Sequence, residues 1–589
     1  MPLVSSGTTN KSQPITPKNS NNIKIEVFHV ITKITNERKL VIHENKTNFS
    51  FLINVVEIVY LIIFLEKHLI VIMNVVRKLN KQILLRDFLL ILAVTSFVLL
   101  LNLGVRPLVV WDEGLYCGTT QDMNFHREWL FPTINGEFSA RYGKPPFVNW
   151  LQGISSSLIG WSKFSLRLPT ALGMLGLVLF TWLTGVLIAG RWVGLIAVCL
   201  LLFSRHLIGM GITIWLENLV APFFAASLLC YGKDFGLFRR IPFLGTILAG
   251  VFTGMAILTK QSFGLFAPAA LVVVELLERR PGMVKRILIY SIAVGVSCGW
   301  WFLLTAHVVG SVSWESWFGY HVYERFTETV EGHTRYPYSF AMSLQQMLDG
   351  TPWVVGLIGW IFLLKNTPEN TEASDLLKRW TALVIIEYIV VGLVSPTFLS
   401  WYQLVIVLPF AIGGAYIIVE SFRNQQYPLW IRWMLPLLIV TNRVIEVKRD
   451  AFLAALVCVA LIWCYETFQL QRFWKPAMSS LLILGAGIFA LRATTGYSRP
   501  DTRAILARDL SEQSSLIVLA KSPLWRIWKC YLPQAVSIPT ELPCDEINKK
   551  IEEANIDRIV IDSPRLSCTL TGFHAVKQDK QISIWEKNV

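Results

Sequence analysis

Charge is scarce in this sequence. Only 16% of its 589 residues are charged, whereas 53% are hydrophobic. A soluble globule of this length would need more polar surface than that composition supplies. The scarcity therefore excludes an ordinary soluble protein and predicts that lipid covers much of the chain.

The usual metal and nucleotide motifs are missing as well. The nine cysteines include no CxxC pair and have no histidines at ligand spacing, so neither a zinc site nor a redox motif is expected. The C-terminal tail has no glycine-rich phosphate loop, which argues against a nucleotide site. Cys530, Cys544 and Cys568 lie in this tail. An oxidising compartment could pair two of them, and the sequence leaves the connectivity open.

The net charge of +14 raises the alternative of nucleic-acid binding. The Lys and Arg residues, however, form short clusters between long apolar runs and do not line one polar face. This distribution favours membrane topology. We therefore expect membrane lipids, and no nucleic acid, among the partners.

Residues 1–84 are predicted to be an extension that is disordered or lies at the membrane interface. The first fifty residues are polar and lack the pattern of a signal peptide. Residues 51–73 are apolar but contain ionisable side chains that are costly at bilayer depth, namely Glu57, Glu66, Lys67 and His68. Because residues from Met73 onward lead directly into a clean apolar span, we hypothesise that the functional protein begins near Met73.

Residues 85–494 are predicted to form a transmembrane catalytic domain. A helix crosses the hydrocarbon with about 20 mostly apolar residues, or fewer inside a bundle. Thirteen segments qualify, with a margin of one: 88–105, 168–190, 192–204, 218–232, 241–258, 263–277, 287–309, 351–364, 380–399, 401–419, 429–441, 451–464 and 476–491.

The distribution of Lys and Arg predicts the orientation of these spans. Short cytoplasmic loops hold the excess of basic residues, and a basic cluster precedes the first span, formed by Arg77, Lys78, Lys81 and Arg86. With thirteen crossings, five later basic loops fall on the same side. The cluster of Arg443, Lys448 and Arg449 would lie on the opposite side, which makes the interval 429–464 the least secure part of the count.

Three long segments are left on the outer side: 106–167, 310–350 and the tail 495–589. Loops longer than about 15 residues are usually functional or disordered, and the first two are too aromatic for disorder. Within the tail, apolar runs predict strands and an amphipathic stretch predicts a helix at 545–555. The predicted fold class is an all-α polytopic membrane protein with a small soluble C-terminal α/β domain.

Two features of the first outer segment could carry chemistry. Asp112 and Glu113 follow the first span by a few residues, although adjacent carboxylates there are often only a solvated loop start. Lys144 stands before Pro145 and Pro146, which favour an extended backbone. Such a lysine could be fixed as a phosphate ligand; the alternative is a lysine that reaches from lipid to water.

These residues form part of a longer pattern that resembles the GT-C integral-membrane glycosyltransferases. The resemblance is to the branch with the aminoarabinose lipid A transferase and the protein O-mannosyltransferases, and it extends over residues 86–420. Three motifs occur in the family's order: Asp112-Glu113, Lys144-Pro145-Pro146 and Arg167-Leu168-Pro169. Together they are far more specific than any one alone.

The resemblance implies a fold of about 13 transmembrane helices of GT-C type. It also implies transfer of a sugar, by single displacement, from a polyprenyl-phosphate donor to a lipid, glycan or protein acceptor. The protein would be a multi-pass component of the inner or plasma membrane, with its active site on the periplasmic or lumenal face. Aminoarabinose, mannose, a hexose and a uronic acid stay open as the sugar.

The resemblance also implies a set of site residues. Asp112, Glu113 and Glu217 match catalytic acidic positions, although relatives usually carry Asp in place of Glu217. The donor phosphate would be bound by Lys144, Lys260, Arg325 and Tyr402. Isolated lysines and tyrosines at span ends more often only anchor the helix at the headgroup level, which is the alternative for Lys260 and Tyr402.

No obligatory metal is predicted. Some relatives place an acidic residue just before the loop lysine, where this chain has Gly143. A divalent cation could still be held by His321 and His333 together with Asp112 or Glu113. Isolated histidines in an aromatic loop are, however, more often hydrogen-bonded structural residues.

The main alternative from another class is a transporter or flippase of lipid-linked sugars that performs no transfer. Such proteins tend to contain paired repeats and ionisable residues near the bilayer midplane. This sequence shows no internal repeat, and its candidate residues fall on one side of the predicted membrane. The asymmetry favours an enzyme over a flippase, and a scaffold that recruits partners through the tail is a third hypothesis.

Overall fold

The computed structural model describes residues 81–494 with gaps at 110–111, 139–143, 233–241, 349–352, 370 and 424–473, and most of residues 503–588. All of these belong to one compact unit, Val76–Val589. Several predictions lie outside the described residues. They are the start near Met73, the interfacial stretch 51–73, the spans 429–441 and 451–464, and the basic cluster of Arg443, Lys448 and Arg449.

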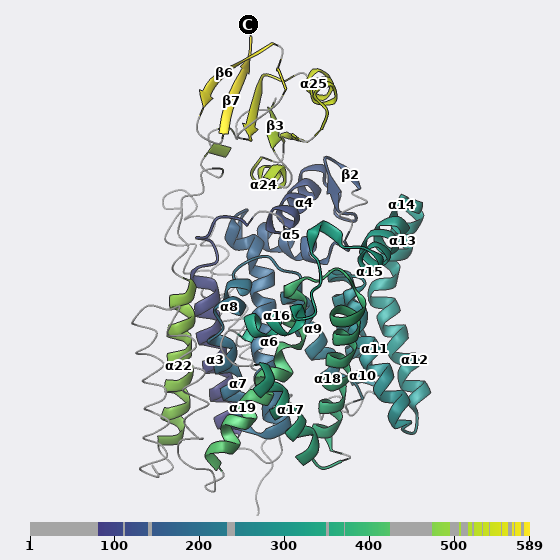
Figure 1. The fold of residues 1–589 in the computed structure, drawn as a ribbon, viewed down its shortest axis with the longest axis vertical. Coiled ribbons are helices and arrows are strands. Elements are labelled where there is room, and N and C mark those ends of the chain that lie inside the picture. The colour runs from purple at the N-terminus through teal and green to yellow at the C-terminus, as the bar shows by residue number, and fades with distance from the viewer. Residues whose placement is uncertain are drawn as a thin grey trace, which may run out of the picture. The chain divides into compact units, whose positions relative to one another are not determined.

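Helices dominate the chain up to residue 494 (Figure 1). The first half contains α3 (Lys81–Leu101), α4 (Asp112–His126), α5 (Phe147–Ile159), α6 (Lys163–Ala189), α7 (Arg191–Leu202), α8 (Arg205–Gly211), α9 (Glu217–Cys230), α10 (Leu244–Thr259), η3 (Phe263–Leu265) and α11 (Phe266–Glu278). The second half contains α12 (Met283–Val294), η4 (Gly295–Gly299), α13 (Trp300–Val309), α14 (Ser311–Trp314), η5 (Glu315–Glu324), α15 (Arg325–Thr327), η6 (Val330–Gly332), α16 (Ser339–Leu348), α17 (Trp353–Asn366), α18 (Glu372–Glu387), η7 (Tyr388–Val394), η8 (Ser400–Ile406), α19 (Val407–Arg423) and α22 (Trp474–Thr494). Every predicted span inside the described ranges overlaps a helix.

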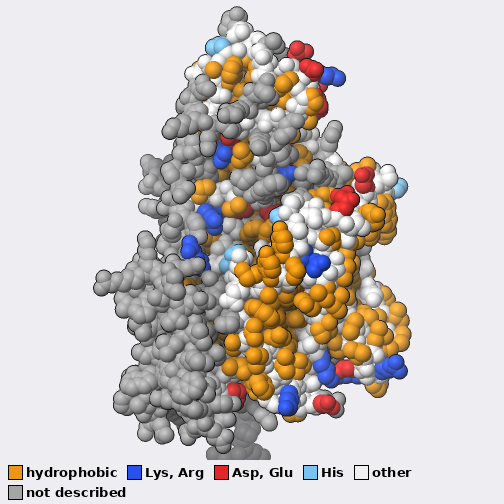
Figure 2. Space-filling view, in the orientation of Figure 1, with side chains coloured by type: hydrophobic (Ala, Val, Ile, Leu, Met, Phe, Trp, Pro, Cys, Tyr) orange, Lys and Arg blue, Asp and Glu red, His pale blue; other side chains and the backbone are white. Residues whose placement is uncertain are grey.

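Several of these helices are apolar enough to make the chain an integral membrane protein. Among the described residues, four are long enough to cross a membrane, and two bent helix pairs raise the number to six if each pair is one span. The predicted count of thirteen stays a prediction. Figure 2 shows hydrophobic side chains covering one face of the helical part. Leu288, Val296 and Leu303, in the stretch from α12 to α13, are exposed.

Small residues let the helices of this part approach one another closely. Gly356 of α17 and Gly413 of α19 meet backbone to backbone, so that a Cβ atom on either glycine would collide with the other helix. Packing through small residues is typical of membrane helices, because lipid supplies no hydrophobic drive for their association. At the start of α6, Ser162 and Ser165 form a capping box that sets where the helix begins.

The C-terminal residues form a five-stranded sheet with strand order β4-β3-β5-β7-β6. Its strands are β3 (Leu516–Ala520), β4 (Val536–Pro539), β5 (Arg558–Asp562), β6 (Phe573–Gln578) and β7 (Ile582–Lys587). β3 lies parallel to β4 and β5, while β7 is antiparallel to β5 and β6. The helices α24 (Leu524–Tyr531) and α25 (Cys544–Glu553) accompany the sheet. The predicted tail strands and helix lie here; their independence as a soluble domain stays a prediction.

Two disulfides fix this C-terminal part. Cys544 pairs with Cys568, and Cys530 of α24 pairs with Cys117 of α4, 413 residues earlier in the chain. The sequence left the connectivity open and did not anticipate a partner in the first outer segment. The Cys117–Cys530 disulfide therefore anchors α24 beside α4, and the two helices pack against each other (Figure 1).

Candidate functional site

One cavity of about 780 Å³ gathers most of the residues predicted to act in catalysis and phosphate binding. Its lining includes Asp112, Glu113, Lys144, Lys260, Arg325 and Tyr402. These residues come from α4, the loop before α5, the end of α10, α15 and η8, so segments nearly 300 residues apart in sequence meet here. Glu217 is not in the lining, but its carboxylate is paired with the ammonium of Lys260.

Asp112 is the first residue of α4 and lies partly buried at the cavity. A helix N-terminus favours a negative charge, because the first backbone N–H groups are unpaired within the helix. The carboxylate is close enough to influence the titration of both Tyr116 and Lys144. The position thus combines a stabilised carboxylate with neighbouring hydrogen-bonding groups.

Lys144 donates a hydrogen bond of 2.7 Å from Nζ to the hydroxyl of Tyr116. Burial lowers the pKa of Lys144 to about 8; the carboxylate of Asp112 works in the opposite direction, while the charge of Lys260 lowers the pKa further. Burial also raises the pKa of the Tyr116 hydroxyl well above its ordinary value. At neutral pH Lys144 therefore contributes a cation to the cavity lining, and its partner Tyr116 is a buried, neutral phenol.

Lys260, Arg325 and Tyr402 form a second group on the cavity wall. The ammonium of Lys260 lies 4.1 Å from the ring centroid of Tyr402, and Nη1 of Arg325 donates to the Tyr402 hydroxyl over 3.3 Å. Glu217, at the start of α9, pairs with Lys260. Tyr402 thus connects two cations that come from distant segments, an arrangement suited to one anionic group.

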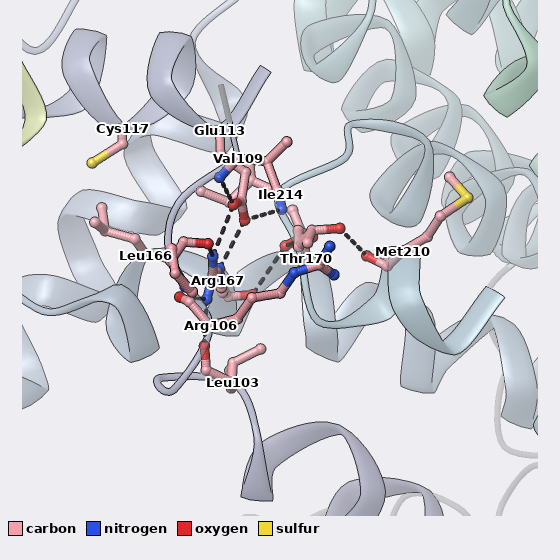
Figure 3. Close-up of polar contacts among 12 residues, drawn as sticks. Leu103, Arg106, Val109, Glu113, Cys117, Leu166, Arg167, Thr170, Met210 and Ile214 are labelled. Carbon is pink, nitrogen blue, oxygen red and sulfur yellow. Dashed lines mark hydrogen bonds and ion pairs between the residues drawn. The ribbon is translucent and has the colours of Figure 1, made fainter. Parts of the chain in front are cut away.

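Glu113, which lines the cavity, forms a buried ion pair with Arg167 (Figure 3). Nε and Nη2 of Arg167 donate to the two Glu113 carboxylate oxygens over 2.7 and 2.8 Å. The carboxylate also accepts from the backbone N–H groups of Val109 and Ile214. These contacts hold together the segment between α3 and α4, the start of α4 and the start of α6.

The remaining N–H groups of Arg167 complete this network. They donate to backbone carbonyl oxygens in the turn after α3, each over 2.9 Å, at Leu103, Arg106 and Pro107 (Figure 3). The side chain is fully buried. The sequence identified Arg167 as part of a motif but gave it no role; the structure gives it a structural one. The predicted catalytic role of Glu113 stays a prediction.

The two candidate metal-ligating histidines line the same cavity. Burial, followed by the charges of Lys144 and Arg325, holds the pKa of His321 well below its ordinary value, so this imidazole is neutral. The ring of His333 packs edge-on against Trp401. Within the described ranges, no group of three or more His, Cys, Asp or Glu residues is placed to hold a metal ion.

Two further residues escaped the sequence analysis: Tyr116, which accepts a hydrogen bond from the lining residue Lys144, and Arg526, which itself lines the cavity. Tyr116 lies four positions after Asp112, so helical periodicity would have placed both on one face of α4. Arg526 of α24 lines the cavity although it lies in the C-terminal part. No spacing in the sequence connects Arg526 with α4; the cysteines at 117 and 530 were the one available signal.

Comparison with known proteins gives a consistent set of relatives. Residues 143–301 match the family described as dolichyl-phosphate-mannose-protein mannosyltransferase. The undecaprenyl phosphate-alpha-4-amino-4-deoxy-L-arabinose arabinosyl transferase of Shewanella sediminis is 25% identical over 75% of this chain and 76% of its own length. The enzyme of the same name from Pectobacterium carotovorum is 27% identical over 46% of this chain and 48% of its own length.

Solved structures show the same fold. ArnT from Cupriavidus metallidurans, crystallised with undecaprenyl phosphate, has a TM-score of 0.66 at 16% identity and covers 84% of this chain and 97% of its own. The Archaeoglobus fulgidus oligosaccharyltransferase, tethered to an acceptor peptide, has a TM-score of 0.50 at 11% identity, covering 81% of this chain and 69% of its own. At these identities the likeness concerns the fold.

Proposed function

We infer that the chain belongs to the GT-C family of integral-membrane glycosyltransferases, and we propose that it transfers a sugar from an undecaprenyl-phosphate-type donor to an acceptor at the outer face of the membrane. The two arabinosyl transferases named above carry undecaprenyl phosphate in their names, and the ArnT structure has it bound. None of the relatives named above is described as a flippase, so they do not support that alternative. The acceptor is a lipid, a glycan or a protein.

The observation that carries this proposal is the meeting of acids and cations from distant segments around one cavity. In a single displacement, an acceptor oxygen attacks the anomeric carbon while the bond from that carbon to the phosphate oxygen breaks. The electron pair of the broken bond stays on the phosphate. Where the acceptor is a hydroxyl, its proton passes to the carboxylate of Asp112.

The cations act on the leaving phosphate. Lys144, Lys260 and Arg325 all line the cavity and stabilise the charge that develops as the sugar departs. Tyr402 contacts both Lys260 and Arg325 and keeps these two cations in position. Glu217 orients Lys260, and Glu113 fixes α4 through Arg167; we propose both as positioning residues.

The isoprenoid tail of the donor occupies the apolar part of the cavity. Phe266 and Ala269 of α11 and Val390 of η7 line this part. A mainly apolar pocket with a few convergent polar groups is the usual form of a small-molecule site. The sugar and phosphate then lie at the polar end, between α4 and α15.

The disulfides support an outer location for the site. Disulfides persist in oxidising compartments such as the periplasm or the lumen of the endoplasmic reticulum. Cys117 belongs to α4, which begins with Asp112, and its partner Cys530 is on α24 beside Arg526. Both sides of the bond are thus next to the cavity, and the proposed active site shares their compartment.

A transfer assay tests the proposal. Membranes containing the full chain are given undecaprenyl-phosphate-linked 4-amino-4-deoxy-L-arabinose or mannose, and labelled sugar is followed into lipid, glycan and protein fractions. We expect transfer from one donor, and its loss in Asp112→Asn at unchanged protein level. Translocation of the intact donor without any transfer to an acceptor would contradict the proposal and favour the flippase.

A further inference from the structure

The C-terminal part contributes a side chain to the cavity. Arg526 of α24 lines the cavity together with Asp112 and Leu115 of α4, and it is 3% exposed. The other cations of the cavity, including Lys144 and Arg325, come from segments before residue 424. Arg526 is therefore brought to the cavity by packing between two separate parts of the chain.

Close backbone packing determines where Arg526 lies. A Cβ atom on Gly114 would come within 2.8 Å of the Ile527 side chain, and one on Gly118 within 2.8 Å of the Arg526 carbonyl oxygen. The two glycines are four residues apart and lie on one face of α4. This face accepts α24 directly, without intervening side chains.

The neighbours of Arg526 anchor α24 on both sides. Cys530 forms the disulfide with Cys117, and Nζ of Lys529 lies 3.2 Å from the buried carboxylate of Asp122. On the sheet side, the indole N–H of Trp528 donates to Asp562 over 2.8 Å. So many restraints within a short helix hold the guanidinium of Arg526 at a defined position.

The charges of the cavity indicate what a guanidinium does there. The lining contains more cations than carboxylates: Lys144, Lys260, Arg325 and Arg526 against Asp112 and Glu113. Arg167 and Glu217, the partners of Glu113 and Lys260, lie outside the lining and cancel each other in this count. Buried charge is stable when an opposite charge balances it. The surplus of positive charge therefore matches anionic substrate groups.

We propose that Arg526 is a substrate-binding residue that recognises a phosphate or carboxylate group of the donor or of the acceptor. The planar guanidinium matches either anion through paired N–H donors. This inference rests on the proposed function and extends it: the site is complete only when the C-terminal part is docked on α4.

Binding measurements on the purified full chain test the proposal. The variants are Arg526→Gln and Arg526→Lys, with Lys549→Gln as the matched control, because Lys549 lies on α25 of the same part with its side chain 75% exposed. The probes are labelled undecaprenyl phosphate for the donor and lipid A for a phosphorylated acceptor.

We expect Arg526→Gln to weaken binding of at least one probe about tenfold or more, the size of one lost charge-assisted contact. Arg526→Lys should recover part of the affinity, and Lys549→Gln should bind as the wild type does. Weaker binding of undecaprenyl phosphate assigns Arg526 to the donor; weaker binding of lipid A assigns it to an anionic acceptor.

Three outcomes would overturn the inference. Unchanged affinity of Arg526→Gln for both probes, with normal wild-type binding, removes the role of Arg526 and leaves the proposed function intact. Equal loss in the Gln and Lys variants together with a lower Tm means that Arg526 only supports the fold. A wild-type chain that binds neither probe contradicts the proposed function itself.

Discussion

Two buried acid–base pairs near the cavity have the same chemistry and different surroundings. Glu113 and Arg167 are almost fully buried, and their polar atoms contact each other and the backbone of two separate segments, residues 103–109 and residue 214. Lys260, paired with Glu217, keeps 12% of its side chain exposed, lines the cavity and lies against Tyr402. In the first pair, the closed pair, both carboxylate oxygens of Glu113 accept from protein donors although Glu113 lines the cavity. In the second pair, the open pair, Lys260 also reaches the cavity and can contact a ligand there.

The comparison shows that sequence proximity to a motif does not settle the role of a charged residue. Asp112 and Glu113 are adjacent and both line the cavity, yet the carboxylate of Glu113 is enclosed by Arg167 and two backbone N–H groups, while the charge of Asp112 acts on Lys144. A buried pair that loses one partner leaves an uncompensated charge. We therefore expect substitutions in the closed pair to act on folding, and those at the cavity to act on turnover or affinity.

The largest effect is expected from Asp112→Asn. Loss of a general base costs about 10²- to 10⁴-fold in rate, and we expect this loss in the transfer assay with an unchanged Tm. The neighbouring Glu113 offers the contrast within one motif. Near-normal turnover by Asp112→Asn would remove the distinction between the two carboxylates.

Glu113→Gln should act mainly on folding. Breaking a buried ion pair by removal of one charge destabilises a protein by about 3–5 kcal/mol, which would lower the Tm of the detergent-purified chain and its yield in membranes. Since the remaining cation causes the cost, the double variant Glu113→Gln with Arg167→Met should recover part of the Tm. A stable Glu113→Gln protein with abolished turnover would instead indicate a catalytic role.

Lys260→Met should reduce affinity for the donor. A hydrogen bond to a charged group contributes about 1.5–3 kcal/mol, so binding of undecaprenyl phosphate should weaken roughly ten- to a hundredfold. Lys378→Met is the matched control, because Lys378 pairs with Glu278 at a site outside the cavity lining. Equal affinities of the two variants would show that Lys260 does not bind the donor, and that the open pair, like the closed pair, only supports the fold.

The smallest effect is expected from pH. The pKa of Lys144 is lowered to about 8, chiefly by burial, so its ammonium is charged below pH 8 and loses its proton above it. Affinity for undecaprenyl phosphate should therefore fall as pH rises from 7 to 9, by up to about tenfold for one titrating group. Lys144→Met should bind weakly with a flatter profile over this interval; a wild-type profile without any fall would contradict the assignment.

Part of this site could be predicted from sequence because its residues lie in motifs. Asp112, Lys144, Lys260, Arg325 and Tyr402 were proposed together, and all five line one cavity. The tail strands were likewise foreseeable, because a short apolar run is local information. Their roles in catalysis and phosphate binding stay predictions.

Other features depend on tertiary packing and had no local signal. Arg167 encloses Glu113, 54 residues earlier in the sequence, because α6 begins beside α4. The place of Arg526 follows from the glycine face of α4, which is apparent only once α24 lies on it. Short motifs report which residues belong to a site, while contacts between distant helices decide which of them a ligand can reach.

The Cys117–Cys530 bond also imposes an order on biosynthesis. Its two sulfurs are 413 residues apart in sequence, so the bond forms only after α24 has been made and has reached the compartment of α4. Docking of α24 on α4 also brings Arg526 into the cavity lining. The lining is therefore complete only after this late step of assembly.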